Sequence, residues 1–199
     1  MKNRILACSL ILSVLAACTL APKESGRAYM FALQQVKVVK QQTTDASLTV
    51  PLPTVAPELD TYRIALIRDG KVWDYYAAAR WAEFLPVVVQ DRALKTLEQS
   101  GLFTSVVSDQ AGVLSTQVLK IEIHSFQAEY DADHVAPTIK VAITVNLQSR
   151  LDRRVLSSFD IAAEKRAERD SLPAIQTAFQ SAFADAQKQL VRKLHQKQL

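Results

Sequence analysis

The chain is poor in cysteine and contains only Cys8 and Cys18 in 199 residues. Cys8 falls inside an apolar N-terminal run that is expected to be removed, so Cys18 would be the one thiol left in the mature protein. A single thiol cannot form an internal disulfide, a redox pair or a thiolate metal cluster. The folded part of the protein must therefore be stabilised by its hydrophobic core.

Glycine is also scarce, with four residues of which none are adjacent. A glycine-rich loop that could cradle a phosphate group is therefore absent from the sequence. The sequence also has no G-x-S-x-G motif, which marks the nucleophile of many hydrolases. These absences predict a protein that is not an enzyme and that uses no cofactor.

The chain has no large excess of charge of either sign. Its formal net charge is +4, and removal of Lys2 and Arg4 with the N-terminal run would leave +2. Proteins that bind nucleic acid neutralise many phosphates and usually carry a marked positive surplus. The near-neutral mature chain therefore argues against a nucleic-acid partner.

The N-terminus has the pattern of a secretory signal peptide. Lys2 and Arg4 precede an apolar run over residues 5–17, and small residues close the run just before Cys18. The run is shorter than the roughly 20 apolar residues that a membrane-spanning helix requires. The sequence therefore predicts a signal peptide over residues 1–17; the alternative is an uncleaved anchor or a chance cysteine.

Residues 15–18 (LAAC) resemble the processing box of bacterial lipoproteins. The resemblance implies cleavage before Cys18, with diacylglycerol on its sulfur and a third acyl chain, such as palmitate, on its amino group. Thr19 stands where Asp marks retention in the inner membrane, and this favours the outer membrane. We therefore expect a lipid-anchored, periplasm-facing protein with Cys18 as its sole attachment site.

Three segments divide the chain. Residues 1–17 are the signal peptide, residues 18–27 are the lipidated cysteine and a tether, and residues 28–199 form a single domain. A flexible tether of about ten residues spans roughly 18 Å on average. The domain should therefore lie close to the membrane that holds its acyl chains.

The first half of the domain shows short strand patterns and one helix. Residues 28–39 and 63–68 read as strands, and Asp69-Gly70 predicts a hairpin turn into residues 72–76. Prolines near residues 48–52 predict an edge strand there. A helix is expected from about residue 85 to residue 100, ended by Gly101.

The second half predicts a strand meander and a closing helix. Apolar residues alternate with polar ones over residues 119–123, 139–147 and 155–163, with a bulge near Ser125 to restore the register. Ser171 and Pro173 begin a helix whose apolar stripe includes Phe179. The predicted fold is therefore α+β in two layers. It is a mainly antiparallel sheet with a C-terminal meander, covered on one face by two amphipathic helices.

Several segments together resemble the ABC-type transport auxiliary lipoprotein family, which includes the PqiC-like proteins of intermembrane lipid transport. They are residues 60–66 (DTYRIAL), 74–86 (DYYAAARWAEFLP), 100–103 (SGLF) and 29–33 (YMFAL), together with the meander and final helix. The Arg-Trp…Leu-Pro portion is the most distinctive. Phe84 departs from the Asp or Pro expected before Leu-Pro.

The resemblance implies a partner of a lipid transporter of the MCE type. Such a system has an ABC ATPase, a permease and a substrate-binding protein with an MCE domain. The implied role is to dock the MCE protein at the outer membrane, and a homo-oligomeric ring is expected because MCE proteins form rings. The alternatives are an outer-membrane assembly or structural lipoprotein, and a periplasmic hydrolase.

Four aromatic residues form the candidate partner-binding site. Trp73, Tyr75, Tyr76 and Trp81 gather at an apparent connection between strand and helix. Such rings usually belong to the core, but Trp and Tyr are also enriched at protein interfaces. The sequence leaves open which of these rings are exposed.

Two polar clusters have a structural interpretation and a functional one. Asp131, Asp133 and His134 could hold a hard metal, but Asp is also favoured in hairpin turns, and no metal site is predicted. His124 is expected on the wet face of its strand and His195 near the chain end. Basic residues at the end of the last helix either complement the helix dipole and aid solubility, or contact anionic lipid headgroups; they are Lys188, Arg192, Lys193 and Lys197.

Overall fold

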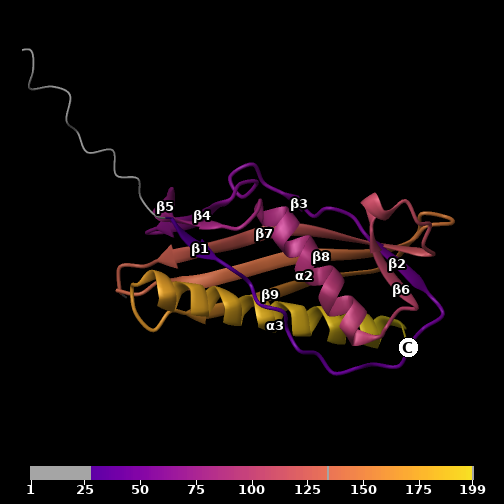
Figure 1. The fold of residues 1–199 in the computed structure, drawn as a ribbon. Helices are drawn as coiled ribbons and strands as arrows, with labels where there is room; N and C mark the ends of the chain where they lie inside the picture. The colour runs from indigo at the N-terminus through magenta and orange to yellow at the C-terminus, as the bar shows by residue number, and fades with distance from the viewer. Residues whose placement is uncertain (1–27, 134, 199) are drawn as a thin grey trace, which may run out of the picture.

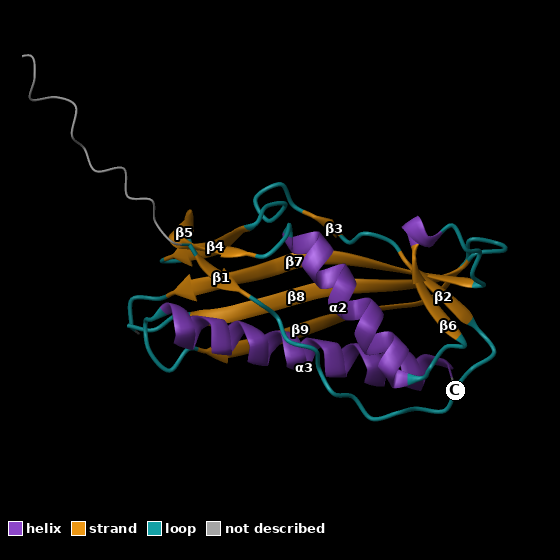
Figure 2. Cartoon of the chain, viewed as in Figure 1, coloured by secondary structure: helices purple, strands orange, loops and turns teal. Residues whose placement is uncertain are grey.

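The computed structural model describes residues 28–133 and 135–198 of the chain. They form one sheet of nine strands with two helices packed on one of its faces (Figures 1 and 2). The elements are β1 (Tyr29–Phe31), β2 (Ser47–Val50), β3 (Thr54–Val55), β4 (Arg63–Arg68), β5 (Val72–Trp81), α2 (Leu85–Ser100), β6 (Ser105–Ser108), the 3₁₀ turn η2 (Asp109–Ala111), β7 (Gln117–Tyr130), β8 (Thr138–Ser149), β9 (Val155–Arg166) and α3 (Leu172–Gln198).

The prediction of a mainly antiparallel sheet is wrong, because the sheet is mixed. Three short strands, β2, β3 and β4, lie one after another along one edge of β7, and all three run parallel to it. The pairs β1–β5 and β2–β6 are also parallel, whereas β4–β5, β7–β8 and β8–β9 are antiparallel. Parallel neighbours require long crossovers, so adjacent segments of sequence do not reveal them.

The expected edge position of residues 48–52 is also wrong. β2 lies between β7 and β6 and pairs with both. Pro51 and Pro53 follow the last residue of β2, so neither removes a donor from its ladder. The prolines therefore end the strand instead of placing it at an edge.

The predicted meander and its bulge are confirmed. β7, β8 and β9 pair in succession as antiparallel strands. Ile123 pairs with Ile143 and Ser125 with Ala142, so His124 is the extra residue of a bulge in β7. This insertion moves Phe126 onto the face that Ile123 occupies before it, and both side chains are buried.

The two predicted helices are confirmed, and their apolar stripes cover the sheet. Gly101 ends α2 in the left-handed conformation, with a φ of 67°, as its C-cap role requires. Phe179 of α3 is fully buried among the rings of Phe31, Trp81 and Phe126. Within the described residues neither helix has the length and apolar content needed to cross a membrane.

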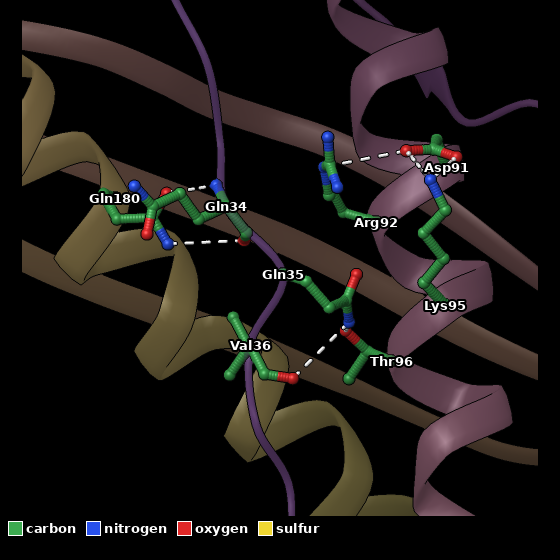
Figure 3. Close-up of polar contacts among 8 residues, drawn as sticks. All are labelled: Gln34, Gln35, Val36, Asp91, Arg92, Lys95, Thr96 and Gln180. Carbon is green, nitrogen blue, oxygen red and sulfur yellow. Dashed lines mark hydrogen bonds and ion pairs between the residues drawn. The ribbon is translucent and has the colours of Figure 1, made fainter.

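The segment that follows β1 differs from the predicted first strand. Only residues 29–31 are a strand, and the extended residues 32–41, here called the strap, run between α3 and α2 (Figure 3). The strap buries Leu33 and Val36 against the core. The Gln180 side-chain amide binds both the N–H and the C=O of Gln34, and Gln35 donates to Thr96 of α2 at 3.1 Å. Helix side chains thus supply the hydrogen bonds that a neighbouring strand would otherwise give.

Candidate docking surface

The structure separates the four aromatic residues of the candidate partner site. Trp81 ends β5 inside the core and is 1% exposed. Its ring makes edge-on contacts with Phe31, at 5.7 Å between centroids, and with Phe179, at 5.2 Å. Trp81 therefore stabilises the packing of α3 on the sheet.

Tyr76 is held in a chain of hydrogen bonds at one end of the molecule. Its hydroxyl lies 2.9 Å from the hydroxyl of Tyr130, which donates to Asp170 at 2.6 Å. Burial raises the pKa of Tyr76 above its usual range, and burial and the bond to Asp170 raise that of Tyr130 to about 12. Both tyrosines therefore stay neutral donors, and they join β5 and β7 to the segment before α3.

Trp73 and Tyr75 point to the face of the sheet that the helices leave uncovered. Trp73 lies opposite Ile67 of β4, and Tyr75 lies opposite Ala65. Leu66 lies between these two β4 residues and beside the helix-facing part of β7, so Ile67 and Ala65 point to the other face. Trp73 is 37% exposed, the largest exposure of the four rings. Of the predicted contact residues, Trp73 is thus the one best placed to reach a partner.

The neighbouring ring of Tyr75 is fixed from two sides. The guanidinium of Arg63 lies 4.1 Å from the ring centroid, and the Tyr75 hydroxyl donates to the carbonyl of Glu58 at 2.8 Å. A cation over an aromatic ring contributes about 0.5–1 kcal/mol at exposed sites. Tyr75 and Arg63 are therefore held in place and would lose little side-chain entropy on binding. Together with Trp73 they are here called the β5 surface.

Polar side chains line the meander on the same uncovered face. The bulge residue His124 has its Nε2 atom 2.7 Å from Oγ1 of Thr144, and that hydroxyl donates to Asp160 at 2.7 Å. Because the Thr144 hydroxyl proton is directed at a carboxylate, the imidazole acts as the donor to its oxygen. His124, Thr144 and Asp160 therefore form a row of hydrogen bonds across β7, β8 and β9. In this row His124 is a donor and does not act as a base toward Thr144.

The structure also places the acidic loop between β7 and β8. Asp131 pairs with Arg166 at 3.6 Å and accepts a bond from the backbone N–H of Asp133 at 3.2 Å. His134 lies outside the described residues. Among the residues that are described, no three His, Cys, Asp or Glu side chains are close enough to share a metal ion.

Sequence reasoning missed an apolar cluster where β1 and β5 meet the start of α2. Phe84 is 43% exposed and its ring lies 5.3 Å from that of Tyr62, edge to face. Val87, three residues further on in α2, is also exposed and lines a hollow of about 270 Å³. The departure of Phe84 from the expected Asp or Pro was the one sign of this cluster in the sequence.

The family profile described as ABC-type transport auxiliary lipoprotein component matches residues 29–191. The chain belongs to this family. The match includes every strand and helix α2, and it ends inside α3. The protein is therefore an auxiliary lipoprotein component of ABC-type transport, and the resemblance found in the sequence is confirmed.

Solved structures share the fold. Protein XCC0632 from Xanthomonas campestris, of the DUF330 family, is 21% identical, with a TM-score of 0.79 over 86% of this chain and 97% of its own. An uncharacterised protein is 13% identical, with a TM-score of 0.65 over 84% and 98% of the two chains. No curated protein matches the sequence. At these identities the structural likeness establishes the fold alone.

Proposed function

We propose that the protein is a non-enzymatic, membrane-anchored lipoprotein that docks the MCE-domain subunit of an ABC/MCE lipid transport system at the outer membrane. Membership in a transport auxiliary family supports the transport role. The observation that carries docking is the exposed Trp73 on the sheet face opposite the two helices. The outer-membrane placement follows from Thr19 after the proposed attachment residue Cys18; both lie outside the described residues.

The anchor limits what the domain can reach. A tether of about ten residues spans at most roughly 35 Å when fully extended, at 3.3–3.6 Å per residue. A domain held at the outer membrane therefore needs another component to connect it to an ABC ATPase and permease in the inner membrane. We assign that connecting role to the MCE-domain protein.

The composition of the β5 surface suits protein recognition. Trp, Tyr and Arg are the residues most enriched among those that dominate binding energy at interfaces. Here one residue of each type lies within a single patch, and Tyr75 and Arg63 are already held in place. The polar meander beside the patch would supply the solvated rim.

We expect Trp73→Ala to reduce recovery of the MCE-domain protein by about tenfold or more, the effect of losing one dominant interface residue. Co-purification from membranes after mild crosslinking would measure this. Phe84→Ala is the matched control, since it removes another exposed aromatic ring at a different place on the domain. Loss of the partner with Phe84→Ala but not with Trp73→Ala would move docking to the apolar cluster.

We also expect repeated subunits, because a ring of lipoproteins facing a ring of MCE domains would gain from multivalent contact. Native mass spectrometry of the detergent-extracted lipoprotein should give multiples of the monomer mass. A monomer at all concentrations tested would contradict the ring. Recovery of an outer-membrane assembly protein in place of an MCE protein would favour an assembly role.

A further inference from the structure

An apolar groove lies between the strap and the C-terminal half of α3. It has a volume of about 320 Å³ and is lined by Val38 and Val39 of the strap and by Val191 of the helix. Val39 is 78% exposed, whereas Val191 is buried in the core. The groove thus presents a valine surface that is open to solvent along one side.

Three cations surround this groove, Lys37 on the strap and Lys188 and Arg192 on α3. None of their side chains has an ion-pair or hydrogen-bond partner within residues 28–133 and 135–198. Other cations in the same part of the fold are engaged. Lys165 pairs with Asp185 of α3 at 2.9 Å, and Lys193 donates to the carbonyl of Asp160 at 2.7 Å.

The helix dipole does not explain the three cations. Its influence falls off within the last turn of a helix. The basic residues in the last turn of α3 are His195 and Lys197, whereas Lys188 and Arg192 lie further back and Lys37 is not in a helix. The dipole therefore accounts for Lys197 but not for the three cations at the groove.

We propose that this groove binds an anionic lipid, with an acyl chain along the three valines and its phosphate or carboxylate among Lys37, Lys188 and Arg192. Apolar surface and unpaired cations side by side match a ligand that carries both an apolar chain and a negative group. The volume is near the lower end for ligand sites, which suits a segment of one chain and not a whole diacyl lipid. The site lies on the helix side of the sheet, away from the β5 surface, and the proposal does not rest on docking.

The test uses the full-length lipoprotein purified in a non-ionic detergent. The probe is lysophosphatidic acid with a photoreactive group in its single acyl chain, and mass spectrometry maps the labelled residues. We expect labelling at Val38, Val39 and Val191. The double variant Lys188→Glu/Arg192→Glu should lower labelling by about tenfold or more, because each basic residue contributes to binding an anionic lipid.

The matched control is Lys71→Glu/Lys120→Glu, which changes the net charge equally at exposed positions away from the groove. An equal loss of labelling in this control would overturn the proposal, because general charge attraction would then explain binding. Val39→Asp should abolish labelling and Val39→Leu should retain it, since only the first puts a charge on the apolar lining. Complete displacement of the probe by millimolar inorganic phosphate would show an anion site with no role for the chain, and would also overturn it.

Discussion

Replacing Phe179 with alanine is expected to lower the free energy of unfolding by about 3–5 kcal/mol, the usual cost of removing a buried ring. The side chain is 0% exposed, and its ring lies 5.2 Å from that of Trp81 and 5.8 Å from that of Phe126. Aromatic pairs contribute about 0.5–1.5 kcal/mol beyond their buried area. The loss is large compared with the typical 5–15 kcal/mol stability of a domain.

Urea denaturation followed by tryptophan fluorescence would measure this change, because Trp81 is in contact with the deleted ring. Leu151→Ala is the control, because this side chain is 97% exposed and its loss should change stability by less than about 0.5 kcal/mol, as for other surface substitutions. An unchanged urea midpoint for Phe179→Ala would show that α3 does not stabilise the sheet. The same result would contradict the core described above.

Cys18→Ser is expected to abolish lipid attachment. The residue closes the one processing-box match in the sequence, and serine cannot form the thioether to diacylglycerol. A single acyl chain gives only marginal membrane binding, whereas three chains give a nearly permanent anchor. The variant should therefore lose its acyl chains and accumulate as an unprocessed precursor.

Metabolic labelling with palmitate would reveal the difference as loss of label from the protein band. Cys8→Ser offers a matched control, since it changes the other cysteine inside the predicted signal peptide and should leave labelling intact. Label retained by Cys18→Ser would place the anchor elsewhere in the chain. Label lost from both variants would point to a general defect in export.

Local patterns predicted the elements whose partners are close in sequence. The strand over residues 63–68, the turn at Asp69 and Gly70, and the helix over residues 85–100 all lie where periodicity placed them. Both turn residues have positive φ values, as the hairpin requires. The bulge was predictable too, because Ile123 and Phe126 had to share a face.

Non-local pairings were not predictable from the same patterns. The three short strands that pair with β7 are separated from it by up to about seventy residues in the sequence. Their alternation of apolar and polar residues does not identify β7 as their partner. The strap resembles a continuation of the first strand in the sequence, because Tyr29, Phe31 and Leu33 alternate. Its hydrogen-bond partners include glutamine side chains of α3 and Thr96 of α2, which a strand pattern cannot show.

The exposure of the candidate site residues was only partly predictable, because the alternation of side chains between the two faces changes phase within β5. Trp73, Tyr75 and Trp81 are separated by even numbers of residues, so simple alternation puts them on one face. The pairing with β4 jumps from Ala65↔Tyr75 to Arg63↔Arg80, so β5 uses five residues where β4 uses two. The odd difference reverses the face, which buries Trp81 and leaves Trp73 exposed.

The proposed anchor at Cys18 precedes β1 and the strap in the sequence, and this order has a mechanical consequence. Tension on the lipid anchor would enter the fold at β1, whose three residues pair with β5 at its end, and would pass directly into the strap. A three-residue strand offers few hydrogen bonds against such a pull, so strap and strand would peel away before the long meander yields. Peeling would uncover Leu33 and Val36 between the helices and remove Val38 and Val39 from the groove beside α3. If the protein is anchored and docked as proposed, stretching it between the two attachments would thus loosen the valine groove first, while β7, β8 and β9 keep the rest of the sheet intact.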